Sequence, residues 1–194
     1  MKVIFVCLGN ICRSPMAESM FHQVVIDAGL ANQIQIDSAG TSDIAAGSPT
    51  DSRTKAVLAE HDLSADGLIA RQLNDQDFYD ADYILVMDQM NMLDARSMAP
   101  AGLADKVHGI YMAVAGKEDH WIVDPWITHR FHDTYESLNE ALPAWLKRIG
   151  LKEMAVIIPQ LKVRRVNSAA RSLPMAAFAL VTERPALILK ARRH

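Results

Sequence analysis

The sequence contains few cysteines and few aromatic residues. Two of its 194 residues are cysteines and 6% are aromatic, so a disulfide scaffold is excluded, and cysteines alone cannot supply a four-ligand zinc site. No apolar run approaches the roughly 18–20 residues that a membrane span needs. The apolar run at the start is broken by Gly, Asn and Arg, where a signal peptide would continue with further apolar residues. We therefore expect a cytoplasmic protein. Half of the residues are apolar, which is enough for one sizeable core.

Charge is distributed unevenly along the chain. The net charge is −3, but residues 151–194 contain nine Lys or Arg and two acidic residues, whereas residues 1–150 contain 11 and 21. The contrast predicts an acidic domain over residues 1–150 and a basic, partly apolar extension over residues 151–194. We expect the extension to be disordered or loosely packed, and contact with an anionic membrane surface is the alternative. We expect no nucleic acid partner.

Strand and helix patterns alternate along residues 1–150. Apolar runs predict buried parallel strands at residues 2–6, 34–36, 83–87 and 107–112. Helical spacing predicts helices at residues 15–28, 51–61, 75–78, 89–98 and 135–149. Ser14 fits the N-cap and Pro15 the first position of the first helix, while the composition of residues 37–49 and 120–129 is typical of loops. This alternation predicts an α/β domain with a parallel sheet.

Both cysteines lie in one short segment, VCLGNICRSP, residues 6–15. The segment joins the first predicted strand to the first helix, where backbone N–H groups and the helix dipole form an anion-binding site. Gly9 allows a tight turn, Asn10 tolerates a positive φ angle, and Arg13 can donate two hydrogen bonds to a phosphate. The sequence therefore predicts a phosphate-binding loop that consists of Leu8, Gly9, Asn10, Ile11, Cys12, Arg13 and Ser14.

Cys7 lies at the floor of this predicted loop, below the anion. The positive field of the loop favours a thiolate, which is the nucleophilic form of cysteine, and the Ser14 hydroxyl can donate a hydrogen bond to the sulfur. The thiolate can then attack phosphorus in line and form a phosphocysteine. Two alternatives remain at this point: a redox pair of Cys7 and Cys12, and two buried structural thiols.

The chain resembles the low-molecular-weight protein tyrosine phosphatases over about residues 1–150. The matching segments are VCLGNICRSPMAE, DSAGT (37–41), GSPTDSR (47–53), ARQ (70–72), YILVMDQMN (83–91) and VDPW (123–126). The resemblance implies three αβα layers with a four-stranded parallel sheet. It also implies a Cys7 nucleophile, an Arg13 phosphate clamp and an Asp124 general acid that protonates the leaving phenolate, without a metal or another cofactor.

The same resemblance assigns supporting roles around the loop. Asn10, Ser14 and Ser38 match polar positions that brace the phosphate-binding loop in the family. Cys12 matches a position from which a disulfide protects the oxidised nucleophile Cys7.

The predicted substrate cleft is less aromatic than is usual in the family. Ile44 lies where many bacterial members carry an aromatic residue, and Trp126 and Ile127 lie where two tyrosines are common. Leu68 takes the place of a frequent histidine. Ile11 matches the bulky residue of tyrosine-specific members, whereas relatives that act on phosphoarginine tend to carry Thr there. We therefore expect Ile11, Ile44 and Trp126 to line a cleft for phosphotyrosine, since Trp126 can stack on a phenyl ring.

The expected function is hydrolysis of phosphotyrosine in a protein substrate, such as a tyrosine kinase, by a monomeric enzyme. A redox-responsive or phosphoprotein-binding module of the same fold and a protein arginine phosphatase are the alternatives. A thiol-coupled arsenate reductase would need cysteines after Cys12, and the sequence has none there. A zinc site at His120, His129 and His132 with Asp119 is a further alternative, and solvated surface histidines are the simpler interpretation.

Overall fold

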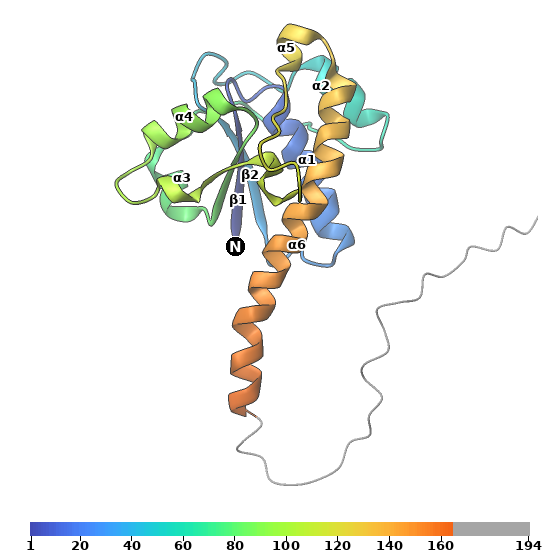
Figure 1. Cartoon of the computed structure of the whole chain (residues 1–194). Helices are drawn as coiled ribbons and strands as arrows, with labels where there is room; N and C mark the ends of the chain where they lie inside the picture. Colours follow the sequence, from blue (N-terminus) through green and yellow to red (C-terminus); the bar gives the residue numbers. More distant parts are fainter. Residues whose placement is uncertain (165–194) are drawn as a thin grey trace, which may run out of the picture. The chain divides into compact units, whose positions relative to one another are not determined.

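The computed structural model describes residues 1–164, and their side chains as far as residue 150 (Figure 1). Its strands are β1 (Lys2–Cys7), β2 (Gln35–Gly40), β3 (Tyr83–Val86) and β4 (Val107–Gly109). Its α-helices are α1 (Arg13–Asp27), α2 (Ser52–Ala59), α3 (Asp75–Asp80), α4 (Gln89–Met98), α5 (Pro125–Thr128) and α6 (Phe131–Arg164), and short 3₁₀ turns cover Ala104–Lys106 and Ile110–Ala113.

The four strands form one parallel sheet in the order β2-β1-β3-β4, which confirms the predicted fold class. Because side chains alternate between the faces of a strand, Val3 and Phe5 of β1 enter one core and Ile4 and Val6 the other. Helices α1 and α6 cover the first face, and α3 and α4 cover the second (Figure 1).

Aromatic side chains fill the larger of the two cores. Phe5 meets Phe21 of α1 edge to face at 5.4 Å between ring centroids. Trp145 of α6 is fully buried, packs edge to face on Tyr83 at 5.5 Å and donates from Nε1 to the Ile110 carbonyl at 2.6 Å. These contacts attach α1 and α6 firmly to the sheet. Within residues 1–164, none of the helices is both long enough and apolar enough to cross a bilayer.

The first helix begins earlier than the sequence pattern predicts. Helix α1 starts at Arg13 with Cys12 at the N-cap, and no side chain caps it. Ser14 is not the N-cap because its hydroxyl contacts Cys7 and Asn10 instead. Pro15 still lies in the first turn, where backbone N–H groups have no partner within the helix, so the missing N–H of proline costs no hydrogen bond.

Three further boundaries differ from the predictions. Strand β2 extends through residues 37–40, predicted as loop, because Ser38 and Gly40 pair with Phe5 and Cys7 of β1. The loop at 120–129 contains the single turn α5, since the Asp124 side chain caps it. Strand β4 ends at Gly109, and a 3₁₀ turn follows.

Helix α6 continues beyond residue 150, the predicted end of the domain, to Arg164. The first part of the predicted extension is therefore helical. The remainder of that prediction, for residues 165–194, lies outside the described residues.

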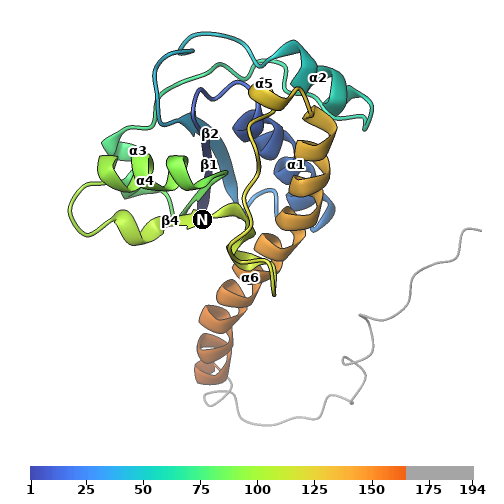
Figure 2. The ribbon, with the colours of Figure 1, turned by 45° about the horizontal axis from the view of Figure 1, so that its top comes forward.

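The strand order predicts a ligand-binding site at the carboxyl-terminal ends of the central strands. From β1 the chain passes to β2 on one side (Figure 2), and the strand order places β3 on the other side of β1. Ligands of open parallel sheets bind at such a switch point, outside the carboxyl ends of the strands. Cys7 is the last residue of β1, and Met87 and Asp88 follow β3. These residues therefore lie together at the carboxyl-terminal ends of the two neighbouring strands.

Candidate active site

The loop between β1 and α1 is anchored by its backbone. The amides of Thr41 and Ser42 donate to the carbonyls of Cys7 and Leu8 at 2.8 and 2.9 Å. A Cβ atom on Gly40 would lie 2.6 Å from the Leu8 carbonyl oxygen, so only glycine allows this close approach. The loop therefore has a fixed conformation at its start.

Asn10 braces the loop from within. Its φ angle is +56°, in the left-handed region that Asn tolerates better than most residues. Its side-chain Nδ2 donates to Ser14 Oγ at 2.9 Å and to Ser38 Oγ at 2.8 Å, while its Oδ1 accepts from the Arg71 amide at 3.0 Å. The three predicted bracing residues thus form one buried hydrogen-bond network.

The Cys7 thiol lies at the floor of the site and is only 3% exposed. Its Sγ is 3.0 Å from Ser14 Oγ. Because Ser14 Oγ already accepts a hydrogen bond from Asn10 Nδ2, the hydroxyl can donate its own hydrogen to Cys7 Sγ or to the Ala39 carbonyl oxygen, which is 3.3 Å away. The network therefore places a hydroxyl donor within hydrogen-bond distance of the Cys7 sulfur.

Arg13 is buried, and its guanidinium binds the carboxylates of Asp88 and Asp124. Its NH2 donates to Asp124 Oδ2 at 2.8 Å, and its NH1 donates to the Ile122 carbonyl at 3.1 Å and to Asp88 Oδ2. Burial alone opposes the positive charge, but the charges of Cys7 and of the two carboxylates outweigh it and raise the pKa of Arg13. The guanidinium therefore stays charged and lines the pocket.

Asp124 is held at the start of α5. Its Oδ1 accepts from the Trp126 amide at 3.0 Å, and Pro125 occupies the first helical position. Its side chain is 22% exposed, so solvent and a bound substrate can both reach it.

Cys7, Arg13 and Asp124 line one pocket of about 310 Å³. A Cβ on Gly9 would contact Ile44, Ala45 and Ile11 at 3.7–4.0 Å, so these apolar side chains gather beside the loop. The whole lining comprises Cys7, Leu8, Gly9, Ile11, Cys12, Arg13, Ile44, Ala45, Asp124 and Trp126. All three predicted cleft residues are therefore in the pocket.

Cys12 lines the same pocket but differs from Cys7 in its surroundings. Burial raises the pKa of Cys12 to about 12, and the carboxylate of Asp51 and the charge of Cys7 add to this effect. Both cysteines are free thiols in this structure. A Cys7–Cys12 disulfide stays a prediction.

Asp88 is a site residue that the sequence interpretation did not assign. It caps α4, with Oδ1 accepting from the Asn91 amide at 2.7 Å, while Oδ2 accepts from Arg13. An acidic residue directly after a buried parallel strand, at the same sheet edge as Cys7, was the signal available in the sequence.

The residues of the alternative zinc site have separate partners. His129 Nδ1 lies 3.1 Å from Arg53 NH1, and His132 Nε2 lies 2.9 Å from Glu60 Oε2. The His120 ring lies 5.7 Å from the Tyr111 ring. In the described part of the chain, no group of three His, Cys, Asp or Glu residues could hold a metal ion.

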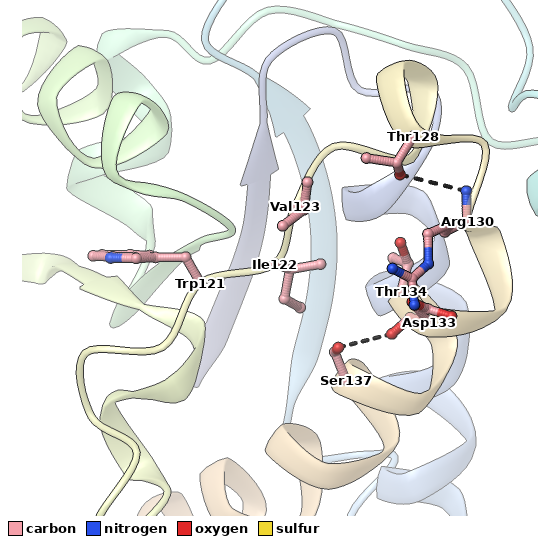
Figure 3. Close-up of a pocket in the computed structure, with 8 residues that line it drawn as sticks. All are labelled: Trp121, Ile122, Val123, Thr128, Arg130, Asp133, Thr134 and Ser137. Atoms are coloured by element: carbon pink, nitrogen blue, oxygen red, sulfur yellow. Dashed lines mark hydrogen bonds and ion pairs between the residues drawn. The ribbon is translucent and has the colours of Figure 1, made fainter.

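A second, smaller pocket of about 180 Å³ adjoins the segment that carries Asp124 (Figure 3). It is lined by Trp121, Ile122, Val123, Thr128, Arg130, Asp133, Thr134 and Ser137. None of the predicted site residues lines it.

The sequence matches one known family over most of its length. The family model described as low molecular weight phosphotyrosine protein phosphatase matches residues 2–155. The chain is 38% identical over 138 residues to the low molecular weight protein-tyrosine-phosphatase YfkJ of Bacillus subtilis, covering 71% of this chain and 88% of that protein.

Solved structures of related proteins have the same fold. The crystal structure of YfkJ has a TM-score of 0.75 at 35% identity, covering 78% of this chain and 96% of that one. A protein tyrosine phosphatase from Entamoeba histolytica has a TM-score of 0.74 at 30% identity, with 79% and 99% covered. A Drosophila arginine phosphatase has a TM-score of 0.71 at 33% identity, with 77% and 98% covered. The chain belongs to the low molecular weight phosphotyrosine protein phosphatase family.

Proposed function

We propose that the protein hydrolyses phosphotyrosine in proteins through a phosphocysteine on Cys7. The observation that supports this most is a buried thiol at the floor of a pocket whose wall carries Arg13 and Asp124. Each of the three groups has a defined part in transfer of a phosphoryl group.

In the first step, Cys7 Sγ attacks phosphorus and the bond from phosphorus to the phenolic oxygen breaks. The phosphate replaces Asp124 as a partner of Arg13, whose guanidinium donates to the equatorial oxygens. Asp124, no longer bound to Arg13, takes part in this step as the carboxylic acid. Asp124 can then give its proton to the leaving phenolate.

In the second step, water attacks the phosphorus of the phosphocysteine. The Asp124 carboxylate, left without its proton, accepts one from this water. The bond from phosphorus to sulfur breaks, Cys7 leaves as a thiolate stabilised by Ser14, and inorganic phosphate is released. Arg13 again binds the equatorial oxygens of the transition state.

The depth of the pocket supports an aryl substrate. Cys7 is almost fully buried, so a long side chain such as phosphotyrosine reaches it more readily than phosphoserine does. The apolar groups of Ile11 and Ile44 and the ring of Trp126 can contact a phenyl ring.

A substrate panel tests this function. Peptides with phosphotyrosine, phosphoserine or phosphoarginine are given to the wild type, Cys7→Ser and Asp124→Ala. We expect turnover of phosphotyrosine by the wild type, none by Cys7→Ser, and a loss of roughly 10²–10⁴-fold in Asp124→Ala. A preference for phosphoserine would contradict the deep pocket, and a preference for phosphoarginine would indicate the arginine phosphatase. Binding without turnover would indicate a phosphoprotein-binding module.

We also propose that the enzyme works in the cytoplasm as a monomer, with tyrosine kinases among its substrates. A nucleophilic thiol needs a reducing compartment, and the described residues of one chain line the pocket. Contact of residues 151–194 with a membrane surface remains a prediction.

A further inference from the structure

Arg53 links the phosphate-binding loop to the segment that carries the proposed general acid. Its Nε and NH2 donate to the two oxygens of Asp51 at 3.0 and 2.9 Å, a bidentate pair. The Asp51 amide in turn donates to the Ile11 carbonyl at 2.9 Å. The guanidinium is thereby fixed relative to the loop that surrounds Cys7.

The same guanidinium contacts one residue of α5 and two residues that follow it. Its carbon lies 5.0 Å from the centre of the Trp126 ring and 4.5 Å from that of Phe131. Its NH1 lies 3.1 Å from Nδ1 of His129. A guanidinium over the face of an aromatic ring is attracted to it, so Arg53 attaches α5 to α2.

Helix α5 needs such an attachment because it is short and little buried. It has four residues and ends at Thr128, and the C-cap residue His129 has a φ angle of +58°. Only Pro125 of the four is buried, whereas Trp126 and Ile127 are 55% and 76% exposed. Packing of its own side chains into the core therefore does little to hold it.

We propose that Arg53 is a positioning residue that holds α5, and with it Asp124 and Trp126, over Cys7. This inference rests on the proposed function, because it concerns the proton that Asp124 gives to the leaving group. Arg53 itself does not line the pocket. Its loss should reduce the fraction of molecules in which Asp124 is correctly placed, and leave the thiol and Arg13 in position.

Two substrates that differ in their leaving group distinguish a positioning role of Arg53 from a general effect on stability. Phenolate, with a conjugate acid pKa of about 10, needs the proton of Asp124 much more than nitrophenolate does. We expect Arg53→Ala to lower kcat/KM about 10-fold for phenyl phosphate, a partial loss of a general-acid contribution of 10²–10⁴. The loss should be much smaller for para-nitrophenyl phosphate.

Three further variants complete the experiment. The Arg148 guanidinium lies 5.4 Å from the Trp145 ring, far from the site. Arg148→Ala removes this cation–π contact and should leave kcat/KM unchanged for both substrates. Arg53→Lys keeps a charge without the planar fork, so it should show the same selective loss even if Arg53→Ala folds poorly. In an Asp124→Ala background, Arg53→Ala should cause no additional loss.

Equal losses for the two substrates, or a full additional loss in the Asp124→Ala background, would overturn the proposal for Arg53. Absence of turnover of either aryl phosphate by the wild type would instead overturn the proposed phosphatase function. The two failures are therefore distinguishable.

Discussion

Asn10 offers the most quantitative test of how the phosphate-binding loop is held. The residue is 3% exposed and makes three side-chain hydrogen bonds, to Ser14, Ser38 and the Arg71 amide. Each such bond contributes about 0.5–1.5 kcal/mol net, and a non-glycine residue at a positive φ angle costs about 1–2 kcal/mol. We therefore expect Asn10→Ala to lower the free energy of unfolding by about 2.5–6.5 kcal/mol.

Asn10→Gly separates the two contributions to this loss. Glycine removes the same hydrogen bonds but adopts the positive φ angle without strain, so this variant should be about 1 kcal/mol more stable than Asn10→Ala. It should still lose kcat/KM, because the Ser14 proton is no longer directed toward Cys7. Equilibrium unfolding in urea and steady-state kinetics measure the two effects.

Asn32 provides the matched control, since it is exposed in a turn. Asn32→Ala should change the free energy of unfolding by less than about 0.5 kcal/mol. The reasoning is refuted if Asn10→Ala is as stable as the wild type, or if Asn10→Gly is less stable than Asn10→Ala.

The remaining predictions concern thiol reactivity, acid stability and the carboxyl-terminal part of the chain. Because burial raises the pKa of Cys12 to about 12, iodoacetamide at neutral pH should alkylate Cys7 and not Cys12, and labelling of both in peptide mass spectra would contradict this. Arg53 lowers the pKa of Asp51, so the paired carboxylate stabilises the fold above the unfolded value of about 3.9 and this contribution is lost as the pH falls further. Asp51→Asn should therefore be less stable than the wild type at pH 7, with the gap closing in acid, and a gap that is constant with pH would refute the pairing. A protein that ends at Arg164 should keep its kcat/KM, because the pocket lies earlier in the chain, and loss of turnover in this folded protein would contradict that.

Local sequence patterns predicted those features that depend on neighbouring residues. The ends of β1 and α4 were predicted to within one residue. A strand in a buried parallel sheet is a continuous apolar run, so its limits are visible in the sequence. The phosphate-binding loop was predictable because Cys7, Asn10 and Arg13 lie within seven consecutive residues.

Contacts between distant parts of the chain explain what the patterns missed. Ser14 has the propensity of an N-cap, but its hydroxyl is bound in the network around Cys7, and the helix begins two residues earlier than predicted. The pairing of Asp88 with Arg13 joins residues 75 positions apart, and Arg53 meets Trp126 across a similar separation. No local periodicity signals such contacts.

Rapid acid quench of the enzyme during turnover of a phosphotyrosine peptide tests the central claim most directly. The intact phosphoryl group should be found on Cys7 by peptide mass spectrometry, and Asp124→Ala should form it more slowly than the wild type. Turnover with no phosphorylated Cys7 peptide, or continued turnover by Cys7→Ser, would contradict the account.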